Sequence, residues 1–188
     1  WETNFIPDIE TFTTYEWKER GAGGATVNFE LAKNTQAAHV SQFPVGTYKK
    51  AHRHGPGAHV IIVSGTGYSL LWPSDGGPHD RMERVNWGVG AMVVPPNDWF
   101  HQHFAVGKDT FRVFNYTGPM PGNPMAGSSR QNDFAQEGEL IMQHGDITQG
   151  GNAIPYHLED PYVRQYFEEQ LKEEGAVSTM PEGVYTEA

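Results

Sequence analysis

The sequence predicts an all-β domain, an antiparallel sandwich or barrel that is followed by one C-terminal helix. Short stretches of alternating or continuous apolar residues recur between turn residues, which is typical of antiparallel strands. The chain of 188 residues contains 22 glycines and 13 prolines, which supply many tight turns. This length suits a single domain with a substantial core.

The predicted strands follow one another through the first two thirds of the chain. In the first of them, Val27, Phe29 and Leu31 fall on one face. Residues 82–90 lead directly into a further apolar stretch. The pattern as a whole predicts strands at residues 25–32, 37–44, 46–54, 59–65, 67–72, 91–96, 99–106 and 110–118.

We expect one domain built from three parts. Residues 1–45 form N-terminal strands and an arm, residues 46–117 form the barrel core, and residues 118–188 form a loop, a helix and a tail that pack on the barrel. Residues 73–80 and 117–129 are rich in proline and glycine, which predicts loops.

The C-terminal helix has clear start and stop signals. Asp160 is a suitable N-cap, Pro161 stands at the first helical position, and Gly175 stands at the C-terminal end. We expect the tail after Val177 to be loose. The stripe that faces the barrel comprises Val163, Tyr166, Phe167, Gln170 and Leu171.

Charge and composition exclude several classes of function. The formal net charge is -10 with no basic cluster, which argues against nucleic acid or an anionic membrane as partner. No apolar run approaches the roughly 20 residues of a membrane span. The chain has no cysteine, so thiolate metal sites and cysteine nucleophiles are excluded. We expect a cytoplasmic protein with a small-molecule partner.

Five of the nine histidines fall in two short clusters, HRHGPGAH and HQH. In a strand, residues i and i+2 share a face, so His52 lies beside His54 and His101 beside His103. Either cluster alone would fit exposed polar alternation. Two clusters on successive apolar strands favour converging imidazoles, which suit iron, manganese, cobalt, nickel, copper or zinc.

The two segments resemble the two motifs of the cupin family. GTYKKAHRHGPGAHVIIVSG, read from Gly46, is similar to motif 1, and GAMVVPPNDWFH, read from Gly90, is similar to motif 2. Pro96 and His101 fit the second pattern, with Asp98 in place of its middle glycine. The resemblance covers about residues 40–117 and implies a cupin-type jelly-roll barrel, an antiparallel double-stranded β-helix with a metal inside.

The resemblance also implies the ligands. Motif 1 carries a glutamate after its second histidine, whereas this chain has Ala58 and His59 there. His59 stands at a spacing that the motif permits, which predicts a centre of four histidines. The alternative is that the glutamate is lost, that His59 only ends a strand, and that three histidines remain. The predicted metal ligands are therefore His52, His54, His59 and His101, with one divalent metal per chain and Fe²⁺ favoured over Mn²⁺, Ni²⁺, Zn²⁺, Co²⁺ or Cu²⁺.

The commonest enzymes of the family suggest an Fe(II)- or Mn(II)-dependent dioxygenase that acts on a small aromatic or carbonyl compound. The alternatives are a non-redox lyase, isomerase or decarboxylase, and a metal-holding barrel without turnover. Acid–base chemistry needs a group near the metal, for which His103 and Tyr68 are the candidates. His103 could equally be a hydrogen-bonded residue of the barrel wall. The resemblance further implies a homodimer.

Overall fold

The computed structural model describes residues 2–3, 5–31, 37–54, 58–117 and 145–186 of the chain. The described part is built mainly from antiparallel strands, which confirms the predicted all-β class. Its strands are β1 (Glu2–Thr3), β2 (Tyr15–Glu16), β3 (Ala25–Leu31), β4 (Ala37–Phe43), β5 (Ala58–Ser64), β6 (Gly67–Trp72), β7 (Glu83–Trp87), β8 (Met92–Val93), β9 (Phe100–Ala105) and β10 (Phe111–Thr117).

The strands form two sheets. The larger sheet has the order β1-β3-β4-β10-β5-β8, with β2 added beside β3, and the smaller has the order β7-β6-β9. Apart from β1, which is parallel to β3, every pair within the sheets is antiparallel. Side chains from the facing surfaces of the two sheets form one apolar cluster of Phe43, Val60, Ile62, Trp87, Val93, Ala105, Phe111 and Val113. We call the space between these surfaces the interior.

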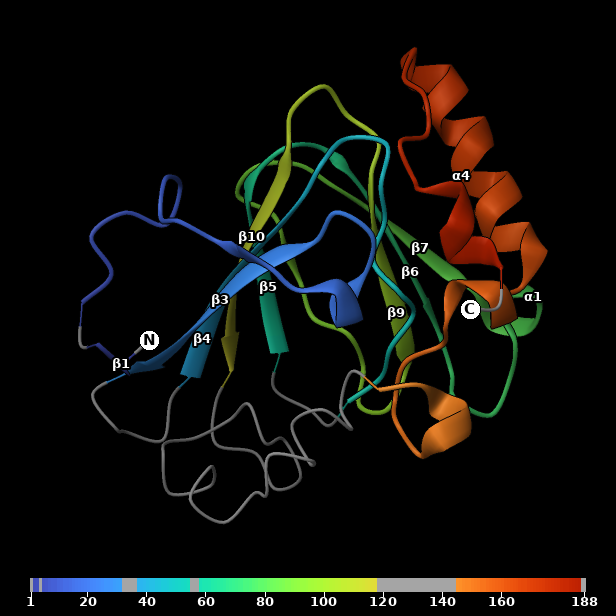
Figure 1. Cartoon of the computed structure of the whole chain (residues 1–188), viewed down its shortest axis with the longest axis horizontal. Helices are drawn as coiled ribbons and strands as arrows, with labels where there is room; N and C mark the ends of the chain where they lie inside the picture. Colours follow the sequence, from blue (N-terminus) through green and yellow to red (C-terminus); the bar gives the residue numbers. More distant parts are fainter. Residues whose placement is uncertain (1, 4, 32–36, 55–57, 118–144, 187–188) are drawn as a thin grey trace.

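The C-terminal helix covers the outer face of the smaller sheet. Helix α4 (Pro161–Glu174) lies beside β6, β7 and β9 in Figure 1. Its buried residues pack on the outward-facing aromatic residues of β6 and β9. The predicted ends are confirmed, because Asp160 accepts a hydrogen bond from the backbone nitrogen of Tyr162 and Gly175 adopts a φ of 70°. The inward stripe buries Val163, Phe167 and Leu171.

An N-terminal arm covers the outer face of the larger sheet, on the side of the molecule opposite α4 (Figure 1). Ile6, Ile9 and Phe12 pack against the outward-facing residues of β3 and β4. Arg112 of β10 fastens this arm, since its guanidinium donates hydrogen bonds to the backbone oxygens of Ile9 and Phe12. The arm thus covers the β3 and β4 part of the larger sheet, as α4 covers the β6 and β9 part of the smaller one.

Three local expectations differ from the structure. Residues 46–54 are not a regular strand but touch β9 through isolated bridges. Residues 73–80 are not wholly a loop, because the short helix α1 (Pro78–Arg81) begins there. The tail after Val177 is not loose: Met180 is buried in the cluster under α4, since an apolar side chain gains free energy by leaving water.

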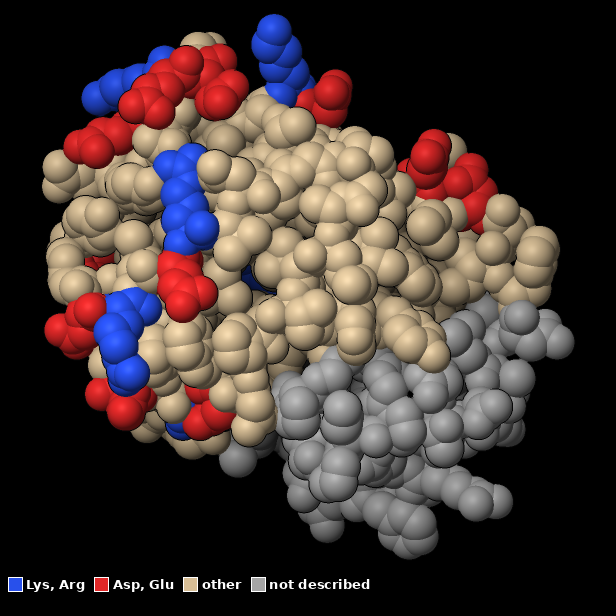
Figure 2. All heavy atoms as spheres, turned by 180° about the vertical axis from the view of Figure 1, so that it is seen from behind, with Lys and Arg blue, Asp and Glu red and all other residues tan. Residues whose placement is uncertain are grey.

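The remaining helical segments are single turns, η1 (Lys18–Arg20), η2 (Ile147–Gln149), η3 (Tyr156–Leu158) and η4 (Glu182–Tyr185). Among the described residues, no helix is both long and apolar enough to cross a membrane. Figure 2 shows that much of the middle of one face carries neither acidic nor basic side chains. The predicted loop at 117–129 lies outside the described residues except for its first residue.

Candidate metal centre

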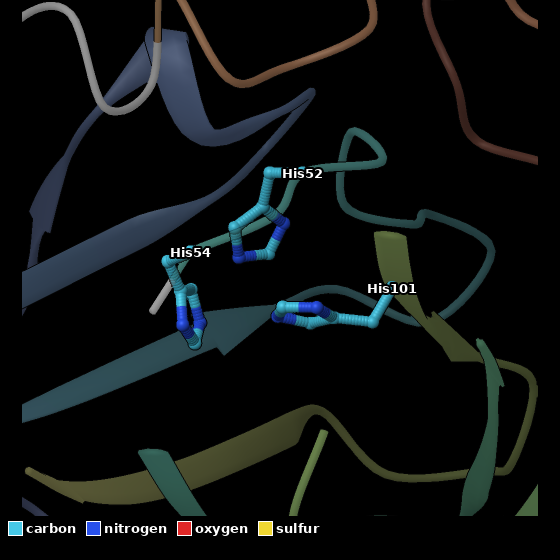
Figure 3. A group of neighbouring side chains, drawn as sticks. All are labelled: His52, His54 and His101. Atoms are coloured by element: carbon cyan, nitrogen blue, oxygen red, sulfur yellow. The ribbon is translucent and has the colours of Figure 1, made fainter. Parts of the chain in front are cut away.

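Three of the four predicted ligands come together in the interior. One ring nitrogen of each of His52, His54 and His101 lies within 4.8 Å of the others. The ring centroids are 4.2 Å apart for His52 and His101 and 4.8 Å apart for His54 and His101. Figure 3 shows the three imidazoles facing one another. We call these residues the histidine group.

Backbone hydrogen bonds hold the two parts of the histidine group in register, although they are far apart in sequence. The backbone nitrogen of His52 donates to the oxygen of His101 at 3.2 Å, and the reverse bond is 2.9 Å long. The backbone nitrogen of Asp98 donates to the oxygen of His54 at 3.0 Å. The predicted convergence of HRH with β9 is therefore a consequence of direct backbone pairing.

Two of the imidazoles are oriented by their second nitrogen. Nδ1 of His52 lies 3.1 Å from the oxygen of Lys50, and Nδ1 of His101 lies 3.1 Å from the oxygen of Trp99. A carbonyl oxygen only accepts, so each Nδ1 carries the hydrogen and each Nε2 keeps its lone pair. A backbone carbonyl in this position fixes the tautomer and the ring orientation of a metal-binding histidine.

The interior also favours the neutral form of His101. Burial holds the pKa of His101 well below its ordinary value, with a further contribution from the neighbouring His54, His103 and Lys49. Metal binding requires the unprotonated ring, so a lowered pKa favours it near neutral pH. Three neutral nitrogen donors at this spacing fit a borderline divalent metal.

The glycines of the two motifs stand where the backbone needs them. Gly46, Gly65 and Gly90 have φ values of 81°, 83° and 85°, a region that favours glycine. Asp98, which replaces a motif glycine, has a φ of 60° and is the one described non-glycine residue with positive φ. The departure from the motif therefore leaves the turn intact, because aspartate tolerates this conformation better than most residues.

His59 does not join the histidine group. In β5, Ala58, Val60 and Ile62 are buried, while His59 alternates with them and is partly exposed. It pairs in register with Tyr116, on the face that looks away from the interior. The outward direction of His59 follows from alternation along the strand, since neighbouring residues point to opposite faces. Ala58, with no ligating atom, holds the inward position, so the structure has the alternative arrangement of three histidines.

His103 faces the interior beside His101, with their ring centroids 5.8 Å apart. Its Nδ1 lies 2.7 Å from Oγ of Ser69, and that oxygen accepts a hydrogen bond from the indole nitrogen of Trp87 at 2.9 Å. Burial, with Lys49 and His54 nearby, lowers the pKa of His103 to about 3. The residue is therefore a neutral, oriented imidazole next to the histidine group.

Tyr68 lies on the opposite face of its sheet. It pairs with Phe104 of β9, whereas the next residue, Ser69, pairs with His103. Its ring stacks on Phe104 with centroids 4.6 Å apart and packs under α4. Because alternate residues of a strand point to opposite faces, Tyr68 is directed away from the histidine group. It is not placed to act as an acid or base there.

The structure adds two cationic residues that the motifs did not indicate as part of the site. Lys49 and Arg20 are buried, with exposed fractions of 8% and 3%. The ammonium of Lys49 donates to Nε2 of His52 at 2.9 Å. From Tyr48 to His52 the chain advances four residues while β9 advances three, so regular alternation is broken there. This irregularity, which no sequence pattern announces, brings Lys49 to the same side as His52.

A surface cavity of about 470 Å³ lies elsewhere, and the histidine group is not in its wall. It lies between the N-terminal turn around Gly21 and the C-terminal residues near Gly183. Lys18, Lys50 and Tyr156 contribute to its lining. Its lining includes Glu16, Asp146 and His157, but among the described residues the group of converging metal-binding side chains is the histidine group.

No family model and no curated protein matches the chain. Similar solved structures include the Schizosaccharomyces pombe Cnp3 cupin domain, with 12% identity and a TM-score of 0.45 over 59% of this chain and 72% of that one. Bacillus subtilis oxalate decarboxylase has 17% identity and a TM-score of 0.46 over 63% and 32%. Salicylate 1,2-dioxygenase from Pseudoaminobacter salicylatoxidans has 16% identity and a TM-score of 0.42 over 51% and 25%.

These similarities concern the fold alone, and the matched region spans a third or less of the two enzymes. The two facing antiparallel sheets and the pairing of the two motif segments at the histidine group agree with the predicted cupin-type jelly roll. The predicted resemblance is thus confirmed. The group of three histidines could hold a metal ion.

Proposed function

We propose that the protein is a metal-dependent oxidoreductase of the dioxygenase type, with one Fe²⁺ or Mn²⁺ per chain bound by His52, His54 and His101. The observation that carries the proposal is the histidine group itself, with two rings oriented by backbone carbonyls. A bound redox metal would supply electron transfer between a small-molecule substrate and O₂. Three protein ligands leave about three positions of an octahedral metal for these molecules.

The buried aromatic side chains beside the histidine group favour a flat or apolar substrate. Trp87 and Phe111 stack with ring centroids 4.2 Å apart, and the ring of His103 lies 6.1 Å from that of Phe111. Phe43 continues the same aromatic surface. Such walls bind aromatic or unsaturated compounds through dispersion and exclusion of water.

The distribution of acid and base groups favours redox chemistry over lyase or isomerase chemistry. The fully buried polar residues of the described chain include no aspartate or glutamate, and Tyr68 faces away. Of the two predicted acid–base candidates, His103 therefore remains the one beside the histidine group. Within the part of the chain that the structure describes, this arrangement favours a reaction that needs no dedicated carboxylate base.

The test is elemental analysis of the purified chain, combined with electron paramagnetic resonance spectra before and after anaerobic addition of nitric oxide. We expect about one iron or manganese per chain and, for the iron form, a new signal with nitric oxide because coordination positions are open. Oxygen uptake with a panel of small aromatic and carbonyl compounds follows. Near-stoichiometric zinc or nickel with turnover under anaerobic conditions would instead favour the non-redox alternative.

The matched variants are His101→Ala, which removes a member of the histidine group, and His59→Ala, which removes a histidine of the outer face. The proposal requires loss of the metal in the first and its retention in the second. Failure of the wild-type protein to bind any divalent metal under all loading conditions contradicts it.

A further inference from the structure

Lys49 makes one hydrogen bond that a bound metal would displace. Its ammonium donates to Nε2 of His52, and Nδ1 of that ring already carries the hydrogen bonded to the oxygen of Lys50. Nε2 has a single lone pair in the ring plane. It can accept from Lys49 or bind a metal, but it cannot do both.

A second cation stands near Lys49. Arg20 lies at the end of η1, and its backbone oxygen accepts a hydrogen bond from the backbone nitrogen of Lys50. Its Nη1 donates to Oγ of Ser41 at 3.1 Å, and its Nε is buried without a hydrogen-bond partner. The residue after Arg20, Gly21, packs against the backbone of Lys49, since a Cβ at Gly21 would lie 3.2 Å from the Cα of Lys49.

Neither cation has an acidic partner within the described residues. No ion pair joins Lys49 or Arg20 to an aspartate or glutamate there. The chain as a whole has 23 acidic residues, yet none of them is among the buried polar residues of the described part. A buried cation without a counter-charge is costly, which leaves the interior prepared for an anion from outside.

We propose that Lys49, supported by Arg20, forms the anion-binding part of the site, so that the molecule bound at the histidine group is a carboxylate. This inference deepens the proposed function and rests on it. When His52 turns its lone pair to a metal, the carboxylate takes over as acceptor for the ammonium of Lys49. The same negative charge offsets the metal charge that three neutral imidazoles leave uncompensated.

The binding experiment uses the full chain loaded with Co²⁺, whose visible spectrum reports on its ligands. Acetate and benzoate are the anionic probes, and acetamide and benzamide are their neutral counterparts of nearly equal shape. We expect saturable spectral changes with the two carboxylates and none with the two amides at the same concentrations.

Three variants assign the anion site. Lys49→Met should weaken acetate binding by at least about tenfold, because a hydrogen bond to a charged group contributes on the order of that factor or more. Lys49→Arg keeps the cation and should retain most of the affinity. Lys108→Met removes an exposed lysine from the turn before β10, and the affinity for acetate should stay as in the wild type. Metal content is measured in parallel, and Lys49→Met should keep its Co²⁺.

The outcomes separate this inference from the proposed function. If the wild-type chain binds no Co²⁺, both are overturned. If Co²⁺ binds and the acetate affinity of Lys49→Met equals that of the wild type, the carboxylate inference alone is overturned. If Lys49→Met does not fold, ¹⁵N-lysine spectra of the Zn²⁺-loaded wild type decide: acetate shifts the signal of one buried ammonium if the inference is correct and shifts none if it is wrong.

Discussion

Single atoms of three imidazoles determine what the histidine group can bind. The backbone oxygens of Lys50 and Trp99 hold Nδ1 of His52 and His101, which leaves Nε2 of each as the donor. Neutral nitrogen donors without a carboxylate favour divalent first-row transition metals over Mg²⁺ or Ca²⁺. The same atoms make the contributions of the ligands strongly non-additive, since each ligand is useful only when the others are present.

At this scale we predict that His52→Ala loses metal binding almost completely, whereas His59→Ala keeps about one equivalent. The first substitution removes a donor of the histidine group, and the second removes a side chain on the outer face of β5. Metal content after extensive dialysis, measured by plasma mass spectrometry, compares the two. Equal loss of metal in both variants would show that His59 is a ligand after all.

A second residue prediction concerns Asp98, whose φ of 60° is unfavourable for branched side chains. Asp98→Val should lower the free energy of unfolding by about 1–3 kcal/mol relative to Asp98→Gly, since glycine adopts this conformation freely. Both variants lose the hydrogen bonds that Arg53 and Ser74 donate to the carboxylate, so their difference isolates the backbone. Urea denaturation measures it, and equal stabilities would contradict the strain.

Among the elements, β9 has the most direct effect on the site because its two faces serve different purposes. His101 and His103 point to the interior, while Phe100, Gln102 and Phe104 point to the layer under α4. The paired alternation of β6 and β9 explains why Ser69 supports His103 while Tyr68 supports the helix. Packing under α4 thereby holds the strand that carries two of the interior histidines.

At the scale of elements we predict that Phe167→Ala lowers the free energy of unfolding by about 3–5 kcal/mol, the range for truncating a buried aromatic residue. Phe167 is fully buried in α4 and contacts the rings of Tyr48 and Phe104. Chemical denaturation measures the change. Gln165→Ala, an exposed position of the same helix, is the control, and a loss below about 1 kcal/mol for Phe167→Ala would contradict the packing described here.

For the whole molecule, one carboxylate links the helical layer to the smaller sheet. Glu159 precedes α4 and accepts hydrogen bonds from the hydroxyl of Tyr48 at 2.6 Å and from the amide of Gln102 at 2.5 Å. Burial raises the pKa of Glu159 to about 7, although the two hydrogen bonds act in the opposite direction. The other titratable groups that influence or face it are Tyr68, Tyr156, Asp160 and Tyr185.

The raised pKa of Glu159 makes a contribution to stability that falls as pH rises, opposite in sign to the contribution of the lowered pKa values of His101 and His103. Between the ordinary value of 4.5 and about 7, Glu159 binds its proton in the folded chain but not in the unfolded chain, so its own contribution to the free energy of unfolding decreases over that window. The contribution of Glu159 amounts to about 3 kcal/mol and is fully lost above pH 7. Denaturation at several pH values should show that Glu159→Gln makes the slope of stability against pH more positive than in the wild type over this window, whereas Glu174→Gln, at the exposed end of α4, should leave the slope unchanged. Equal pH slopes for the wild type and Glu159→Gln between pH 4.5 and 7 would contradict the assignment.

The homodimer and the cytoplasmic location stay predictions, and both are properties of the whole molecule that one chain does not test. Size-exclusion chromatography with light scattering would measure the oligomeric state directly.

Local signals in the sequence predicted most of the strands, the C-terminal helix and the members of the histidine group. The alternation of apolar residues predicted the strands, the caps at Asp160 and Gly175 predicted α4, and the spacing of His52, His54 and His101 predicted the histidine group. These features depend on residues that are close in the chain or on motifs with fixed spacing, so they can be recognised without coordinates.

The tertiary structure alone decided which face each residue occupies. Whether Ala58 or His59 turns inward depends on the register of β5 against β10, and a shift of one residue would exchange them. The register of β6 against β9 likewise directs Ser69 to the interior and Tyr68 to the layer under α4. Lys49 reaches His52 because the chain is locally irregular beside β9, and Arg20 arrives in the interior from a distant turn. Contacts of this kind depend on long-range pairing, which a sequence does not reveal one segment at a time.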